Sequence, residues 1–271
     1  MMILPAICSI LFLVQARNQH NIVAGSLSAV KSSTVEPLVT VTANKLLDAV
    51  CEHFEKRGLG AKSTEIEELI DELASQEVVF DPALCLNGPL YAVQYIDLGP
   101  GKKPPSWVKY TTKGSIAGQL YELKESGSID NLRVINYAEI FQGAVTIKSE
   151  GGCQLSKDAE GSNEEQYTKP RNPFEQLFSK PVTKLNIKNK KYLKCPVDYI
   201  VPPGSSLSSS ISLFGREVYK FSIKGEGTAR VIYANKDMRI FEAPPTEENW
   251  EPRGIRTVQV RIDLVKDSFK L

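Results

Sequence analysis

The stretch from Arg216 to Ala243, REVYKFSIKGEGTARVIYANKDMRIFEA, alternates apolar and polar residues between turn signals. Tyr219, Phe221 and Ile223 fall on one side of an extended chain, and Lys220 falls on the other. This pattern is typical of antiparallel strands that have one buried face and one solvated face. The sequence YANKD near the end of the stretch is typical of a hairpin turn.

Segments of the same style fill most of the chain after Leu90, and we count about nine to eleven of them. In the last one, RTVQVRIDLV, alternation places Val258, Val260, Ile262 and Leu264 on one face. Because no helical pattern interrupts these segments, the fold is expected to be mainly β, as a barrel or a sandwich. We favour a lipocalin-like antiparallel β-barrel, which can enclose a cavity.

A helix hairpin is predicted before the strands. The first helix should begin at a capping residue, Thr42 or Asn44, and end at Gly58. Thr64 and Glu67 have the spacing of a capping box at the start of the second helix. The apolar stripes that each helix must bury are Leu46, Leu47, Val50, Cys51 and Phe54, and Ile66, Leu69, Ile70 and Leu73. The pair either closes an open end of the barrel or packs on its outside.

The N-terminal residues are typical of targeting segments. Ile3 to Val14 form an apolar run of signal-peptide length, and small residues follow it, so residues 1–16 are interpreted as a signal peptide. Residues 17–40 resemble a transit segment, because they are rich in Ser and Thr and almost free of acids. This order predicts import into a complex plastid; a plain leader on a secreted protein is the alternative. Residues 42–267 are expected to form one domain, with an insertion loop at 149–169.

Composition and catalytic residue types argue against several functions. The net charge of +1 does not favour a nucleic-acid partner. His53 is the single histidine beyond the leader, and the Gly99–Gly101 segment lacks the sequence of a phosphate loop. We therefore expect that the protein is not an enzyme. No metal site is expected, because the cysteines are far apart; we interpret them as structural and reduced. These are Cys51, Cys85, Cys153 and Cys195.

Three stretches in this order carry a family resemblance: KLLDAVCEHFEKRGLGAKSTEIEELIDELA, LNGPLYAVQY and GEGTARVIYANKDMRIFEAP. The chain resembles the plastid-lipid-associated proteins, or plastid fibrillins. The matching positions are Arg57, Gly58, Leu59 and Ala61 in the helix joint, Leu86 and Gly88 before the first strand, and Tyr233, Asp237 and Arg239 in the late hairpin. The resemblance implies a lipocalin-like barrel that binds lipids or isoprenoids at plastid membranes or lipid droplets.

Aromatic residues on apolar strand faces are the candidate ligand contacts, because aromatic rings offer large contact areas and polar tips. A filled core without a cavity would show the same pattern. Arg239 is expected on the strand face of Asp237, where it either pairs with an acid on an adjacent strand or orients a polar ligand head at a cavity mouth. The candidates are Tyr91, Tyr95, Tyr219, Phe221, Tyr233 and Arg239.

The sequence thus predicts a plastid lipid- or isoprenoid-binding structural protein at thylakoid or plastoglobule surfaces. No cofactor is expected other than a bound lipid, carotenoid or quinone, and the partners are a membrane or lipid-particle surface and photosynthetic complexes. Two alternatives remain open. One is a structural or assembly subunit of a photosynthetic complex with a filled barrel, and the other is a secreted lipocalin-like carrier.

Overall fold

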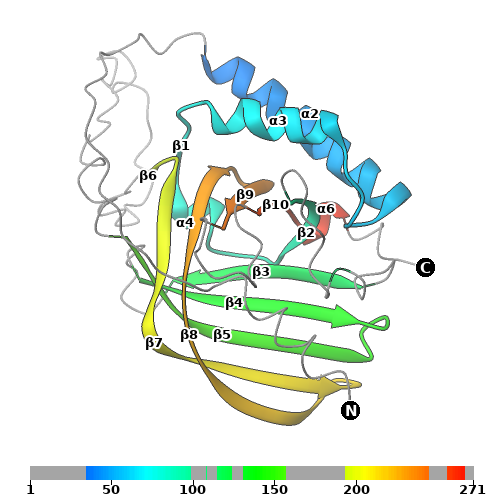
Figure 1. Ribbon diagram of the computed structural model, residues 1–271, viewed down its shortest axis with the longest axis vertical. Coiled ribbons are helices and arrows are strands. Elements are labelled where there is room, and N and C mark those ends of the chain that lie inside the picture. The colour runs from blue at the N-terminus through cyan, green and yellow to red at the C-terminus, as the bar shows by residue number, and fades with distance from the viewer. Residues whose placement is uncertain are drawn as a thin grey trace, which may run out of the picture.

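The structure is a computed structural model that describes residues 35–98, 108, 115–123, 131–156, 193–243 and 255–265 (Figure 1). The predicted signal peptide, most of the leader and much of the insertion loop lie outside the described residues. Within the described ranges, no helix combines the length and the apolar character needed to cross a bilayer.

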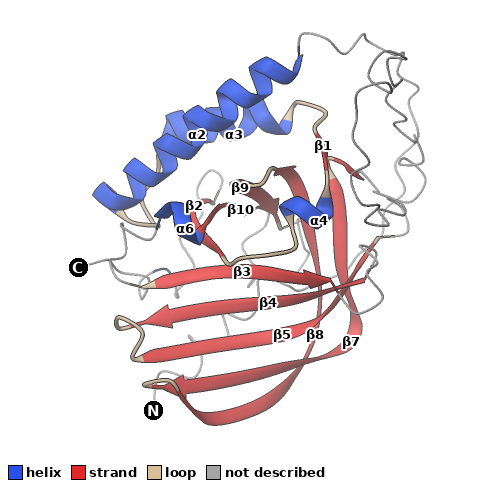
Figure 2. Cartoon of the chain, turned by 180° about the vertical axis from the view of Figure 1, so that it is seen from behind, coloured by secondary structure: helices blue, strands red, loops and turns tan. Residues whose placement is uncertain are grey.

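Eight antiparallel strands form a closed barrel, which confirms the predicted fold class (Figures 1 and 2). Their order around the barrel is β10-β2-β3-β4-β5-β7-β8-β9. The strands are β2 (Tyr91–Asp97), β3 (Ile116–Leu123), β4 (Asn131–Ile140), β5 (Val145–Leu155), β7 (Val197–Leu213), β8 (Arg216–Ala234), β9 (Met238–Glu242) and β10 (Arg256–Arg261).

The described residues after Leu90 form nine strands, which agrees with the predicted nine to eleven, and eight of these belong to the barrel. The boundaries differ from the prediction, because some expected segments are joined into single long strands. Both β7 and β8 contain two such segments. Their pairing shifts between Val201 and Ser205, where Gly204 has a φ of 75°. A bulge of this kind bends a strand without ending it. Similarly, β5 continues through the start of the expected loop at Ser149 as far as Leu155.

Four short elements complete the described fold. β1 (Val79–Phe80) pairs with β6 (Leu193–Lys194), and α4 (Pro82–Cys85) follows β1. The fourth is α6 (Ile262–Val265), which directly follows β10. The sequence prediction of one continuous strand here was wrong, and Leu264 is 46% exposed rather than aligned with Val260 in the core.

The two helices are longer or start earlier than predicted. α2 (Val35–Arg57) already begins at Val35, so Thr42 and Asn44 lie inside it and do not cap it. It ends as expected at Gly58, whose φ is 73°. α3 (Thr64–Ala74) is capped by Ser63, one residue before the predicted cap, and the Ser63 hydroxyl accepts a hydrogen bond from the Ile66 amide.

The helix pair packs on the outside of the barrel, as Figure 2 shows. Its buried residues form one cluster with outward-facing residues of the sheet. Leu69 is only partly buried, although the sequence placed it in the buried stripe. The cluster contains Ala43, Leu46, Val50, Ile66, Ile70 and Leu73 from the helices, and Ala92, Tyr95, Ile232, Tyr233, Met238, Ile240, Val258 and Val260 from the strands.

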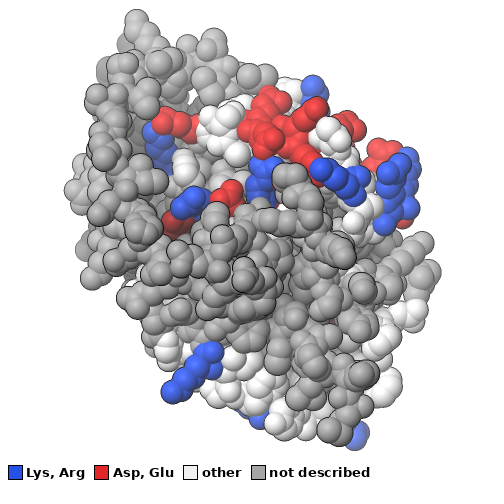
Figure 3. Space-filling view, in the orientation of Figure 1, with Lys and Arg blue, Asp and Glu red and all other residues white. Residues whose placement is uncertain are grey.

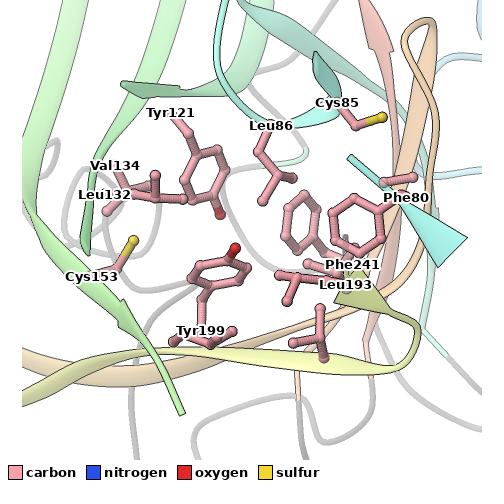
Figure 4. Close-up of a cluster of buried hydrophobic side chains, with 14 of the residues drawn as sticks. Phe80, Cys85, Leu86, Tyr121, Leu132, Val134, Cys153, Leu193, Tyr199 and Phe241 are labelled. Atoms are coloured by element: carbon pink, nitrogen blue, oxygen red, sulfur yellow. The ribbon is translucent and has the colours of Figure 1, made fainter. Parts of the chain in front are cut away.

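One end of the barrel is filled with side chains. In Figure 4, Tyr121, Tyr199 and Phe241 approach one another from different strands, and Leu86 enters beside them from the chain after α4. We call this the filled end. Its cluster also contains Phe80, Cys85, Leu132, Val134, Cys153, Leu155, Leu193, Cys195, Val197, Val201, Leu207, Val231 and Ala234.

Candidate functional site

Arg239 lies inside the barrel and is completely buried. Its Nε donates a hydrogen bond to Oε1 of Gln259 at 2.8 Å, and its two Nη atoms donate to the carbonyl oxygens of Leu86 and Gln119. The guanidinium carbon is 4.2 Å from the ring centroid of Tyr91 and 4.9 Å from that of Tyr121. These contacts connect β9 to β10, to β3 and to the chain after α4.

Arg239 has no acidic partner among the described residues, so one of its two expected roles, an ion pair with an acid on an adjacent strand, was wrong. Its neighbours in register are Gln259 on β10 and Ala234 on β8. The aromatic rings stabilise its charge through cation–π contacts instead. Burial lowers the pKa of Arg239 to about 10, so it stays protonated at neutral pH.

Buried polar side chains form a belt around the inside of the barrel. Gln119, Asn136, Ser149 and Ser209 are successive register partners on β3, β4, β5 and β7. The amide of Gln119 donates to Oδ1 of Asn136 at 2.7 Å, and the Ser209 hydroxyl donates to that of Ser149 at 2.9 Å. Gln259 donates to Oε1 of Gln119 at 3.0 Å and so links the belt to Arg239. We call these five residues the polar belt.

A second apolar layer lies on the other side of the polar belt, toward the end of the barrel away from α4. On β4, Ala138 and Ile140 follow Asn136 at spacings of two, so all three share the inner face. We call this set the open-end layer. It contains the buried residues Ala138, Ile140 and Ile147 and the partly buried residues Val145 and Ile211, and Phe221 and Ile223 of β8 pack against it. Phe221 is the register partner of Ser209 and Ile223 that of Leu207, so these two side chains extend the layer past the belt.

One of the spaces beside the polar belt is a small cavity. A cavity of about 20 Å³ is lined by Gln119, Gln259, Thr257 and Phe241, together with other residues of β8, β9 and β10. That volume accommodates one water molecule, and a lipid head group does not fit.

The six candidate ligand contacts do not come together. Tyr91 is inside the barrel beside Arg239, and Phe221 belongs to the open-end layer. Tyr219 is 59% exposed, with its ring centroid 5.3 Å from that of Phe221. Tyr95 and Tyr233 lie on the outer face under the helices.

The hydroxyls of these two outer tyrosines have structural partners. Tyr95 accepts a hydrogen bond from the Ser63 amide at 2.9 Å, and Tyr233 accepts one from the Asn235 side chain at 2.9 Å. Burial raises the pKa of Tyr95 and of Tyr233 to about 12. Both residues therefore hold the helices and the late turn in place.

The residues that carry the family resemblance shape turns and joints. Gly58 ends α2 beside the exposed Arg57, and Gly88, with a φ of 132°, donates its amide to the Tyr121 carbonyl at 3.2 Å. Asp237 lies in the β8–β9 turn and forms an ion pair with Arg261 at 3.3 Å. It is thus separated from Arg239, contrary to the predicted shared face.

His53 joins the helix hairpin to the barrel. Its Nε2 lies 2.9 Å from the Ala61 carbonyl oxygen, and its ring meets the ring of Tyr95 edge-on at 5.4 Å. Cys51, Cys85, Cys153 and Cys195 are all free thiols. In the described parts of the chain, no group of three or more His, Cys, Asp or Glu residues is arranged to hold a metal ion.

Comparison with known proteins found no family model, no curated protein and no solved structure that matches this chain.

Proposed function

We propose that the chain is a plastid lipid- or isoprenoid-binding structural protein that works at thylakoid or lipid-droplet surfaces. The observation that carries this proposal is the open-end layer. Ile211, Phe221 and Ile223 lie on the inner face of the sheet, yet they are only partly buried. They leave an apolar wall accessible beside a buried polar belt, and this combination suits an amphipathic ligand.

The bound ligand would place its apolar chain against the open-end layer and its polar head toward the belt. Ser149 and Ser209 are the belt residues nearest in register to Phe221, since Ser209 pairs directly with it. Hydroxyl groups both donate and accept hydrogen bonds, so they suit the oxygen atoms of a quinone or a neutral lipid head. A membrane lipid, a carotenoid or a quinone fits this description.

Extraction of lipids from the purified protein, followed by native mass spectrometry, tests the proposal. Replacing Phe221→Gln should reduce the amount of bound apolar ligand. The matched control is Val218→Gln, because Val218 lies on the same strand and is 55% exposed. If wild-type protein carries no apolar ligand and takes up none from lipid mixtures, the proposed binding function is wrong.

The plastid location is proposed on the N-terminal sequence. A fusion of residues 1–45 to a fluorescent reporter should enter a complex plastid. Retention of the reporter in the cytosol contradicts the plastid assignment, and its secretion supports the carrier alternative.

One observation favours the second candidate, a structural or assembly subunit of a photosynthetic complex. The apolar cluster of the filled end and the small cavity of about 20 Å³ beside the polar belt support a barrel that is filled with its own side chains. If this candidate is correct, the protein will co-purify with detergent-solubilised photosynthetic complexes and will contain no extractable ligand.

A further inference from the structure

Two hairpin turns lie side by side at the end of the barrel away from α4 (Figures 1 and 2). The first joins β4 to β5 and begins at Phe141, and the second, between β7 and β8, consists of Phe214 and Gly215. The Phe214 amide donates a hydrogen bond to the carbonyl of Ala144 in the first turn at 2.8 Å. The two turns therefore form one projecting structure, which we call the tip.

Both phenylalanines occupy backbone conformations that their side chains disfavour. Phe214 has a φ of 47° and Gly215 a φ of 79°, so the two-residue loop has positive φ at both positions. Asn-Gly is the preferred sequence for such a loop. Phe141 also has a positive φ, 53°. Local turn chemistry therefore does not account for an aromatic residue at either position.

Packing does not account for these residues either. Phe214 is 85% exposed and Phe141 is 67% exposed. The neighbouring Leu213 and Tyr219 are 40% and 59% exposed. Strained, exposed aromatic residues at two adjacent turns indicate a function outside the fold.

Basic residues flank the tip. Lys148 on β5 and Lys220 on β8 both pair with Ser210, which lies between them, and Arg216 follows the second turn directly. All three basic side chains are exposed. The nearby acids are Glu139, which accepts a hydrogen bond from the Tyr137 hydroxyl, and the exposed Glu217.

The helix hairpin carries the opposite charge. Figure 3 shows acidic side chains gathered over the helices. A groove between α2 and α3 is lined by Lys45 and by five acids: Asp48, Glu52, Glu65, Glu68 and Glu72. An anionic surface would repel this face and attract the basic flank of the tip, so it would orient the molecule with the tip toward it.

We propose that Phe141 and Phe214 insert into the interface of an anionic lipid bilayer. Aromatic side chains favour the boundary between lipid head groups and acyl chains, and the flanking Lys and Arg side chains contact the anionic head groups. This inference rests on the proposed function, because it gives the membrane surface and the part of the chain that meets it.

The experiment measures co-sedimentation of the full chain with vesicles of phosphatidylcholine, with and without phosphatidylglycerol. Phe141→Asn and Phe214→Asn suit this test, because Asn tolerates positive φ and the fold should persist. We expect each change to weaken vesicle binding roughly tenfold. Leu84→Asn is the control, since Leu84 is 61% exposed and lies on α4, so this change should leave vesicle binding unaltered.

A second readout distinguishes membrane binding through the tip from membrane binding through the N-terminal apolar run, which all these variants retain. Phe214→Trp should show tryptophan fluorescence that lipids brominated on their acyl chains quench more than the fluorescence of wild type. Equal quenching in the two proteins overturns the proposal. Unchanged vesicle binding by Phe141→Asn and Phe214→Asn overturns it too, as does self-association of wild type through these residues without vesicle binding.

Bound apolar ligand, measured in the same preparations, distinguishes this inference from the proposed function. Ligand retained in Phe214→Asn together with lost vesicle binding supports the tip. If wild-type protein retains ligand but does not bind anionic vesicles, membrane insertion of the tip is wrong and the proposed function stands. If the protein never contains ligand, the proposed binding function is wrong.

Discussion

Arg239 of β9 stacks on Tyr91 of β2, with the guanidinium carbon 4.2 Å from the ring centroid, although β10 lies between their strands. The contact therefore crosses the inside of the barrel rather than following the sheet. The same guanidinium donates to the carbonyl of Leu86, just before β2. The Arg239 side chain thus links the segment before β2 to strands β2, β3 and β10. These contacts lie at the filled end.

This arrangement predicts that replacing Arg239 destabilises the protein strongly. Arg239→Met removes the donors for the Leu86 and Gln119 carbonyls, and the expected loss of unfolding free energy is about 3 kcal/mol or more. Arg239→Lys should recover little, because an ammonium lacks the planar fork. Denaturant titration measures both losses.

Arg230→Met provides the control for this change. Arg230 forms an ion pair with Asp198 at 2.9 Å and is partly exposed, so its removal should cost about 1 kcal/mol or less. Equal losses of unfolding free energy in Arg230→Met and Arg239→Met would contradict the role of Arg239 in linking strands inside the barrel.

The helix pair gives a second prediction, which concerns two adjacent residues of α3. Ile70 is completely buried against the barrel, whereas Leu69 is partly exposed and lines the outer groove. Ile70→Asp buries an unpaired carboxylate and should cost several kcal/mol. Leu69→Asp should cost clearly less. Thermal unfolding measures the difference, and similar losses in both variants would show that α3 does not pack as described.

The strand pattern was readable in the sequence because alternation reports burial on one side of a sheet. The boundaries of the strands were less readable. The Pro-Pro-Gly sequence at residues 202–204 resembles a turn, but in β7 it forms a bend opposite Gly225 and Gly227 of β8. Turns and bulges use the same residues, so only the partner strand distinguishes them.

Bulges also explain why the candidate ligand contacts were misplaced relative to one another. Register shifts near Val93 in β2 and between Val231 and Tyr233 in β8 reverse the alternation. Tyr95 and Tyr233 consequently face the helices. The polar belt escaped prediction because alternation assigns Gln119 or Ser209 to solvent, although Gln119 and Tyr121 visibly share one face in GQLYEL.

Alkaline pH should destabilise the fold. Burial raises the pKa of Cys85 to about 11 and the pKa of Tyr95 to about 12, above the ordinary values of a thiol and a phenol. Between the ordinary and the raised values, the unfolded chain has lost protons that the folded chain retains. Stability that is fully present near pH 8 should therefore fall as pH rises from about 9 toward 12.

Tyr95→Phe tests one contribution to this alkaline loss. The variant loses the hydrogen bond from the Ser63 amide and should be less stable at pH 7. Its stability should nevertheless fall less steeply between about pH 10 and pH 12 than that of wild type. Denaturant titrations across this range compare the slopes, and a steeper slope in the variant would contradict the assignment.

The last prediction concerns two glycines in strands of the barrel, Gly118 of β3 and Gly151 of β5. A Cβ atom at Gly118 would lie 2.2 Å from the backbone oxygen of Tyr91, and at Gly151 it would lie 2.1 Å from Cδ2 of Leu207. Leu207 can relieve the contact by changing its rotamer. The Tyr91 backbone cannot move away in the same manner, because Tyr91 and Ala92 are the two residues through which β2 pairs with β3. Gly118→Ala should therefore cost about 3 kcal/mol, and Gly151→Ala about 1 kcal/mol. Chemical denaturation of both variants measures these costs, and hydrogen exchange should show that Gly118→Ala loosens the amides of β2 first. If Gly151→Ala lowers the free energy of unfolding more than Gly118→Ala does, the close approach of β2 to β3 is not the tighter steric constraint in this barrel.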